Sequence, residues 1–192
     1  LVHKYSQKPV INGGDGRHAH PTQALLDIYS IWEKLGDLKG LKITIVGDIL
    51  HSRVVRSNLI GMEKLGAKVT VCGPKTLMPG NMESVYGCKV EYDLGRALSG
   101  ADVVMGLRMQ LERMSEGLFP SLEEYSKHYV LSKDTLRHAK PNALIMHPGP
   151  MNRGVEILPE IADNTNSVIV EQVSNGVAVR MALMFLILGG KA

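Results

Sequence analysis

Residues 20–23, with the sequence His-Pro-Thr-Gln, place two side chains that could hold a polar ligand at the start of a predicted helix. Pro21 suits the first helical position, so we expect His20 to be the N-cap and the N–H groups of Thr22 and Gln23 to point out of the helix end. An anion or a polarised carbonyl group could bind there. Because Gln23 follows His20 by three residues, both side chains can share one side of the first turn. The alternative is a simple cap with a solvated glutamine.

Arginine and glutamine side chains follow two predicted strands. Arg53 opens a predicted helix, where the helix dipole disfavours a cation unless an anion is bound at the same end. Arg108 and Gln110 are two residues apart in an extended segment, so their side chains should point to one side. These three residues therefore either hold a ligand or belong to a solvated helix start and a charged surface loop.

A turn with the sequence His147-Pro148-Gly149-Pro150 follows another predicted strand. A proline on each side of a glycine fixes an unusual backbone and allows a cis bond at Gly149–Pro150. The carbonyl groups of Pro148 and Gly149 could then face a ligand instead of a neighbouring strand. The alternative is a rigid turn that binds nothing.

Short β-branched runs alternate with helical patterns and position these residues. Residues 42–46 and 68–72 are predicted strands closed by glycine, and the segment between them has helical spacing. Further strands are predicted at residues 89–92, 102–105, 143–146 and 167–170. Apolar and polar residues do not alternate along these runs, as is typical of strands that are buried on both faces of a sheet. We predict an α/β fold, with a doubly wound, mainly parallel sheet flanked by helices (Rossmann-like). Ligands bind such sheets beyond the carboxyl ends of the strands, where the candidate residues lie.

Composition excludes several classes of protein. The chain has 192 residues, 44% of them hydrophobic and 21% charged, which fits one ordinary domain with room for part of a second. A net charge of +3 without contiguous Lys/Arg blocks argues against nucleic-acid binding. Gly47 stands alone where a dinucleotide fingerprint needs three glycines. Cys72 and Cys88 form no metal-binding or disulfide pattern, so we expect a reduced, cytoplasmic protein without a metal.

The ends of the sequence suggest a larger protein. The longest apolar run, residues 181–188, is well short of the ~20 residues that span a bilayer, so no membrane partner is expected. The first residues, LVHKYSQKPV, have neither an initiator Met nor a signal-peptide pattern. We therefore expect the chain to come from inside a longer protein.

Four stretches together resemble the family of aspartate carbamoyltransferase catalytic chains, within the transcarbamoylase superfamily. They are GDGRHAHPTQALLD at 14–27, GLKITIVGDILHSRVVRS at 40–57, R-x-Q-x-E-R at 108–113 and HPGPMNRGVEI at 147–157. H-P-x-Q marks the superfamily, and the last two stretches mark the aspartate enzymes. Ornithine transcarbamoylases instead carry His-Cys-Leu-Pro where this chain has residues 147–150.

The resemblance implies transfer of a carbamoyl group from carbamoyl phosphate to L-aspartate, in pyrimidine biosynthesis, without a cofactor. By position, His20 would be catalytic, donating to the carbamoyl oxygen. Gln23 and the carbonyl groups of Pro148 and Gly149 would hold the carbamoyl NH₂ group. The two aspartate carboxylates would be bound by Arg53 and Arg108, with the help of Gln110. The alternatives are a transcarbamoylase with another amino-acid acceptor and a non-catalytic scaffold.

The resemblance also implies an amino-terminal carbamoyl-phosphate domain, whose phosphate-binding loops are missing from this sequence, and a homotrimer with possible regulatory or pathway partner chains. Residues 1–19 would be the tail of that domain, with its last strand at 9–12. Residues 20–176 would form the aspartate-binding domain. Residues 177–192 would contain a helix, at 177–188, that packs on the missing domain. We expect the chain alone to be inactive, and the loop 111–127 to close over substrate.

Overall fold

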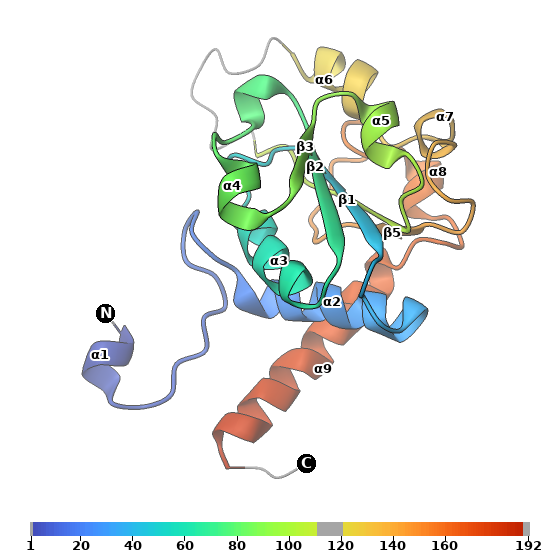
Figure 1. Cartoon of the computed structure of the whole chain (residues 1–192). Coiled ribbons are helices and arrows are strands. Elements are labelled where there is room, and N and C mark those ends of the chain that lie inside the picture. Colours follow the sequence, from blue (N-terminus) through green and yellow to red (C-terminus); the bar gives the residue numbers. More distant parts are fainter. Residues whose placement is uncertain (1, 111–120, 190–192) are drawn as a thin grey trace.

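The computed structural model describes residues 2–110 and 121–189 and is built on a five-stranded sheet (Figure 1). The strand order is β3-β2-β1-β4-β5, and every pairing between neighbours is parallel. The strands are β1 (Lys42–Val46), β2 (Lys68–Cys72), β3 (Lys89–Glu91), β4 (Val103–Gly106) and β5 (Leu144–Met146). The predicted α/β fold with a doubly wound parallel sheet is therefore confirmed.

Helices cover both faces of the sheet, so its strands are buried on both sides. Ile43 and Ile45 of β1 pack in the core cluster that includes α2 and α3, whereas Val46 packs in a second cluster with α5 and α8. Thr44 is also buried, and its hydroxyl donates to Ala97 O of α5 at 2.7 Å. The helices on these faces are α2 (Pro21–Leu35), α3 (Arg53–Lys64), α5 (Leu94–Leu98), α7 (Lys133–Leu136) and α8 (Pro159–Ala162).

The remaining helices lie toward the edges of the sheet or beyond it. Tyr125 of α6 is buried in a small cluster with Leu77 and Met109. Helix α1 stands apart from the body of the molecule and is joined to it by an extended segment (Figure 1). These elements are α1 (Val2–Ser6), the 3₁₀ helix η1 (Lys75–Leu77), α4 (Met82–Tyr86), α6 (Leu122–Tyr129) and α9 (Ile169–Ile187).

One predicted strand is wrong, and another has no partner strand among the described residues. Residues 167–170 form no strand, because Ser167 makes a single bridge to Ile145 and helix α9 begins at Ile169. The apolar run resembles a strand locally, but Ile169, Gln172 and Gly176 recur at helical spacing and are buried. The last helix thus begins eight residues before the predicted 177. Residues 9–12 belong to no strand in the described part of the chain; they form the extended segment that follows α1.

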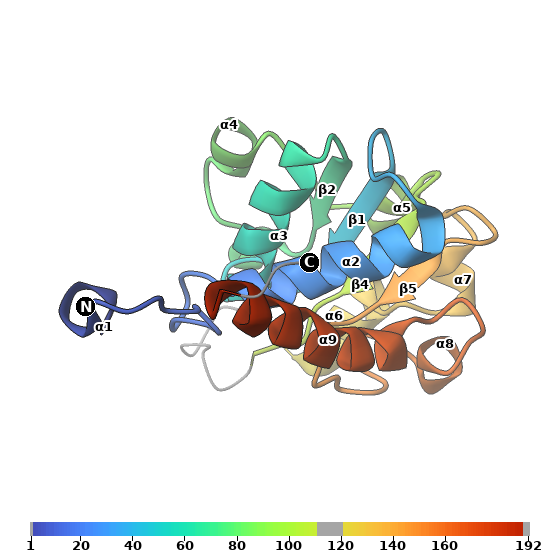
Figure 2. The same cartoon turned by 90° about the horizontal axis from the view of Figure 1, so that it is seen from below.

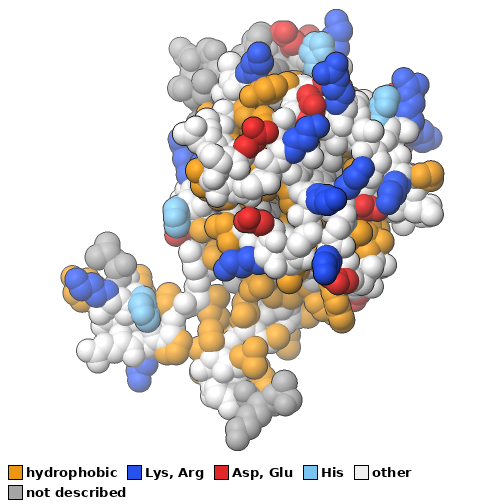
Figure 3. All heavy atoms as spheres, in the orientation of Figure 1, with side chains coloured by type: hydrophobic (Ala, Val, Ile, Leu, Met, Phe, Trp, Pro, Cys, Tyr) orange, Lys and Arg blue, Asp and Glu red, His pale blue; other side chains and the backbone are white. Residues whose placement is uncertain are grey.

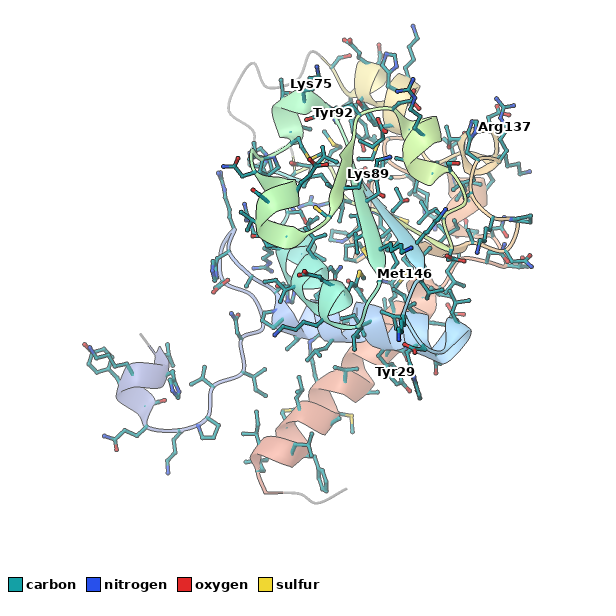
Figure 4. All side chains as sticks on the ribbon, in the orientation of Figure 1. Tyr29, Lys75, Lys89, Tyr92, Arg137 and Met146 are labelled. Atoms are coloured by element: carbon teal, nitrogen blue, oxygen red, sulfur yellow. The ribbon has the colours of Figure 1, made fainter. Side chains whose placement is uncertain are left out.

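Helix α9 crosses α2 (Figure 1 and Figure 2), and one of its apolar faces is exposed. A Cβ at Gly176 would lie 3.1 Å from Leu26 Cδ2, so glycine allows the two helices to approach closely. Farther along, Val177, Met181 and Phe185 are more than half exposed. Hydrophobic side chains gather over α9 and α2 at the bottom of Figure 3, and Tyr29 projects from α2 at this side (Figure 4).

Helix α9 is also longer than the apolar run suggested. Among the described residues it is the one helix whose length and mean hydropathy would permit a membrane crossing. Helices that pack against another protein surface can have the same composition.

Candidate active site

Three strand exits that carry candidate residues lie side by side at the carboxyl edge of the sheet. Arg53 follows β1, Arg108 and Gln110 follow β4, and the His147–Pro150 turn follows β5. Strands β2 and β3 lie on one side of β1, and β4 and β5 lie on the other. The strand order therefore reverses between β1 and β4, which is the topological switch point where such sheets bind ligands. Gly47, with φ +137°, lies so close to the β4 exit that a Cβ would be 2.8 Å from Leu107 O.

The first turn of α2 and the turn after β5 both line one cavity of about 390 Å³. Gln23 contributes from α2, Pro148 and Gly149 from the turn, and Arg180 from α9. The structure thus brings together the three residues expected to hold a carbamoyl NH₂ group. Gln23 is only 8% exposed, so the alternative of a solvated glutamine is wrong.

His20 is the N-cap of α2 and Pro21 follows it at the first helical position, as predicted. The His20 N–H donates to Ser57 Oγ at 2.9 Å, which ties the start of α2 to α3, and its side chain makes no capping hydrogen bond. Burial lowers the pKa of the half-buried imidazole, and the positive charges of Arg53 and Arg180 lower it further. A neutral imidazole predominates at neutral pH and retains one N–H donor.

Arg53 lies at the start of α3, with its guanidinium group against the backbone of Gly14. A Cβ added at Gly14 would be 2.7 Å from Arg53 Cζ, and Gly14 has a φ of +128°. The Arg56 guanidinium donates to Arg17 O, so the segment before α2 is held over the start of α3. Ser52 caps α3 by accepting a hydrogen bond from the Val55 N–H.

Arg108 and Gln110 extend from the exit of β4. Met109 between them is buried in the small cluster with Tyr125, so the alternation of an extended segment directs Arg108 and Gln110 away from that cluster. The Oε1 atom of Gln110 is buried and accepts no hydrogen bond from the described residues. Among the described residues, the lining of the 390 Å³ cavity includes neither of these side chains, nor those of His20 and Arg53. Residues 111–120 of the predicted closing loop lie outside the described residues, and its later part begins α6.

The turn after β5 is held by hydrogen bonds from several directions. The peptide bond Gly149–Pro150 is cis, as the sequence allowed, and Gly149 has a φ of +65°. The Gly149 N–H donates to His147 Nδ1 at 3.0 Å, so the ring proton lies on His147 Nε2, 3.4 Å from Glu156 Oε1. The His147 N–H donates to Gln172 Oε1 at 2.9 Å. These contacts fix the position of the Pro148 and Gly149 carbonyl groups.

Sequence reasoning missed a buried polar cluster behind the cavity. The Asp27 carboxylate accepts hydrogen bonds from Gln23 Nε2, Asn58 Nδ2 and Gln172 Nε2. Asp27 lies one helical turn after Gln23, so the spacing of two polar residues on one helix face was an available signal. Gln172 gave no such signal, because its position depends on where α9 begins. Arg180, which lines the cavity, was missed for the same reason.

Two family models together match most of the chain. The Asp/Orn-binding domain of aspartate/ornithine carbamoyltransferases matches residues 39–187, and the carbamoyl-P-binding domain of the same family matches residues 1–33. The chain belongs to the aspartate/ornithine carbamoyltransferase family.

Members of this family with similar sequences are named aspartate carbamoyltransferase catalytic subunits. Those of Moorella thermoacetica and Caldanaerobacter subterraneus subsp. tengcongensis are each 56% identical to this chain, over 99% and 96% of its length. These matches cover 62% and 60% of the two relatives. The chain therefore spans about three fifths of the length of these carbamoyltransferases.

Solved carbamoyltransferase structures share the fold. Ornithine carbamoyltransferase from Pyrococcus furiosus superimposes with a TM-score of 0.84 at 32% identity, covering 100% of this chain and 63% of that one. Aspartate transcarbamoylase from Trypanosoma cruzi, in complex with aspartate and phosphate, gives 0.75 at 27% identity, covering 93% and 57%.

Proposed function

We propose that this chain forms the aspartate-binding part of an aspartate carbamoyltransferase, which transfers the carbamoyl group of carbamoyl phosphate to L-aspartate. The products are N-carbamoyl-L-aspartate and phosphate. The observation that carries the proposal is the shared cavity of Gln23, Pro148 and Gly149, beside a neutral His20. The names of the relatives at 56% identity favour aspartate as the acceptor.

The carbamoyl group would be held by what we call the carbamoyl side, made of His20, Gln23, Pro148 and Gly149. Negative charge grows on the carbamoyl oxygen as the aspartate amine attacks, and the N–H of the neutral His20 ring would donate to that oxygen. One such donor typically contributes about 2.7–4 kcal/mol of transition-state stabilisation. Gln23 Oε1 and the carbonyl groups of Pro148 and Gly149 would accept from the carbamoyl NH₂ group and so fix which face is attacked.

Aspartate would be held by the acceptor side, made of Arg53, Arg108 and Gln110. Each guanidinium offers a planar pair of donors that matches a carboxylate. These two arginines would bind the two carboxylates, with Gln110 assisting. The departing phosphate would accept the proton from the attacking amine, so the protein would act mainly by orienting the reactants and by electrostatics.

The phosphate group would be bound by further residues of the carbamoyl-phosphate-binding domain, whose family model matches residues 1–33 of this chain. Leu25 and Tyr29 of α2, with Ala182 and Leu186 of α9, line an apolar groove of about 400 Å³. We propose that this face packs on the rest of that domain, since an uncovered apolar face of this kind is typical of an interface. The active form would be a cytoplasmic homotrimer, with regulatory or pathway chains as further partners. The chain alone would not turn over.

Ornithine is the second candidate acceptor, because the Pyrococcus furiosus ornithine enzyme superimposes over the whole chain. The test is to incubate the full-length protein that contains these residues with carbamoyl phosphate and either amino acid. We expect carbamoyl-aspartate and no citrulline. Citrulline formation, or no product with either amino acid, would refute the proposal. The 192-residue chain assayed in parallel should form no product.

A further inference from the structure

We propose that Asp27 is a positioning residue that fixes the amide of Gln23 and the turn after β5 in the arrangement that receives the carbamoyl NH₂ group. This inference rests on the proposed carbamoyl transfer. Asp27 itself lines neither the cavity nor the surface: its side chain is fully buried between α2, α3 and α9. It would act through its neighbours.

The contacts of Asp27 link three elements. Its Oδ1 atom accepts from Gln23 Nε2 at 2.9 Å and from Gln172 Nε2 at 2.8 Å. Its Oδ2 atom accepts from Asn58 Nδ2 at 2.9 Å. The partners come from α2, α9 and α3, in that order, and all three are neutral amides. One carboxylate therefore joins the helix that carries His20 to the helix that begins with Arg53.

The chemistry of a carboxylate determines the orientation of each amide. An ionised carboxylate only accepts hydrogen bonds, so each amide must turn its NH₂ group toward Asp27. For Gln23, the oxygen Oε1 is then the atom left for the cavity. An amide turned the other way would present an NH₂ group to the carbamoyl NH₂ group, and two donors cannot pair. Asp27 thus selects the orientation of Gln23 that carbamoyl binding requires.

The same carboxylate also supports the turn after β5, which lines the cavity, through Gln172. Because Gln172 Nε2 donates to Asp27, its Oε1 atom faces the other way and accepts from the His147 N–H at 2.9 Å. His147 in turn accepts from the Gly149 N–H through Nδ1. A continuous chain of hydrogen bonds therefore runs from Asp27 to the turn whose carbonyl groups would face the carbamoyl NH₂ group.

A charged residue at this place costs stability. Burial raises the pKa of Asp27 to about 6, and the three amide donors only partly oppose that rise. An apolar side chain would fill the same space between the helices without this cost. A carboxylate at this place, bonded to Gln23 and Gln172, therefore points to a role in the site beyond packing.

The test compares Asp27→Leu with two matched variants in the full-length enzyme, using kcat and the KM values of both substrates. Asp27→Leu keeps the number of side-chain heavy atoms and the branch at Cγ but removes the acceptor. We expect kcat/KM for carbamoyl phosphate to fall at least about tenfold, as for other lost orienting hydrogen bonds. Asp27→Asn should rescue it to within about threefold. The new amide can keep its oxygen on both glutamines while Asn58 turns its Oδ1 atom, which accepts no hydrogen bond from the described residues, toward the new NH₂ group.

Asn58→Leu is the control for a purely structural role. It removes a member of the same buried cluster but leaves both glutamines bonded to Asp27, so kcat/KM for carbamoyl phosphate should stay within about threefold even if the melting temperature falls. Equal losses in Asp27→Leu and Asn58→Leu, or an unchanged value in Asp27→Leu, would overturn the proposal.

If Asp27→Leu does not fold, Asp27→Ser carries the same test, because its hydroxyl is too short to reach either glutamine. If the wild-type enzyme does not carbamoylate aspartate, the proposed function and this inference both fail. If the wild type is active and Asp27→Leu is equally active, only this inference fails.

Discussion

The two sides of the candidate site are built in different ways. On the carbamoyl side, Gln23 and the turn after β5 are held by buried hydrogen bonds and line one cavity. On the acceptor side, the Arg53 guanidinium rests against Gly14, and Arg108 extends half-buried from the exit of β4. The core thus fixes the carbamoyl geometry in advance, whereas the two arginines of the acceptor side have more rotatable bonds, which cost more entropy to fix. Changes on the first side should therefore affect kcat, and changes on the second should affect the KM for aspartate.

The largest effect should come from the carbamoyl side. In the full-length enzyme, His20→Ala removes the donor to the carbamoyl oxygen, so kcat should fall by about 10²–10³, as for the loss of one oxyanion donor. The KM for aspartate should change little. Steady-state kinetics with both substrates provides the measurement. A large rise in the aspartate KM with kcat intact would assign His20 to the acceptor side instead.

Arg108→Lys should affect the acceptor side and leave the carbamoyl side unchanged. Lysine keeps the positive charge but loses the planar fork, so the KM for aspartate should rise about tenfold or more. The KM for carbamoyl phosphate should stay near its wild-type value. If the aspartate KM is unchanged, Arg108 does not bind a carboxylate of the acceptor.

The stability cost of the buried carboxylate should depend on pH. The folded-state pKa of Asp27 is raised to about 6 from 3.8, so the folded state holds this proton more tightly than the unfolded state. Its penalty is absent well below pH 3.8, grows as the pH rises, and is complete above pH 6. Asp27→Asn should therefore gain more stability over the wild type at pH 7.5 than at pH 5, by on the order of 1 kcal/mol.

Urea unfolding of both proteins at the two pH values measures this difference. The other titratable groups are the same in both proteins, so their effects on stability cancel in the comparison. The hydrogen-bond partners of Asp27 are amides, which do not titrate. A gain that is equal at both pH values, or larger at pH 5, would show that Asp27 has no raised pKa.

The smallest effect should come from the support of Arg53. An alanine at Gly14 would require a left-handed backbone and place its Cβ 2.7 Å from the guanidinium group. Because the arginine is flexible, it should move away, and the KM for aspartate should rise by about two- to fivefold. Gly13→Ala is the matched control, since no atom lies within 4 Å of its Cβ position. Similar KM values in the two variants would mean that Gly14 does not position Arg53.

The sequence predicted local features well and long-range pairings less well. Strands β1 and β2 match their predicted residues, and His20 caps α2 as expected. These features depend on short-range patterns of β-branched residues and on proline. The apolar run at 167–170 fits either a strand or a helix, and only its packing against α2 and β5 favours the helix.

The candidate site shows the same division. Gln23, Pro148 and Gly149 were identified from their places at a helix start and a strand exit, and the fold brings them together. Asp27 and Gln172 were not identified, because their contact joins residues far apart in the chain. A hydrogen bond of that kind leaves no local pattern in the sequence.

The most direct test of the proposed site is a crystal structure of the full-length enzyme with N-(phosphonacetyl)-L-aspartic acid, the ligand named in a solved structure of the Trypanosoma cruzi aspartate transcarbamoylase. Its carbonyl group occupies the place of the reacting carbamoyl carbonyl, and its aspartate part carries both carboxylates. We predict that a ring nitrogen of His20 lies within hydrogen-bond distance of that carbonyl oxygen, and that Arg53 and Arg108 each bind a carboxylate. A carbonyl oxygen bound away from His20, or carboxylates held by other residues, would contradict the proposed roles of these three residues.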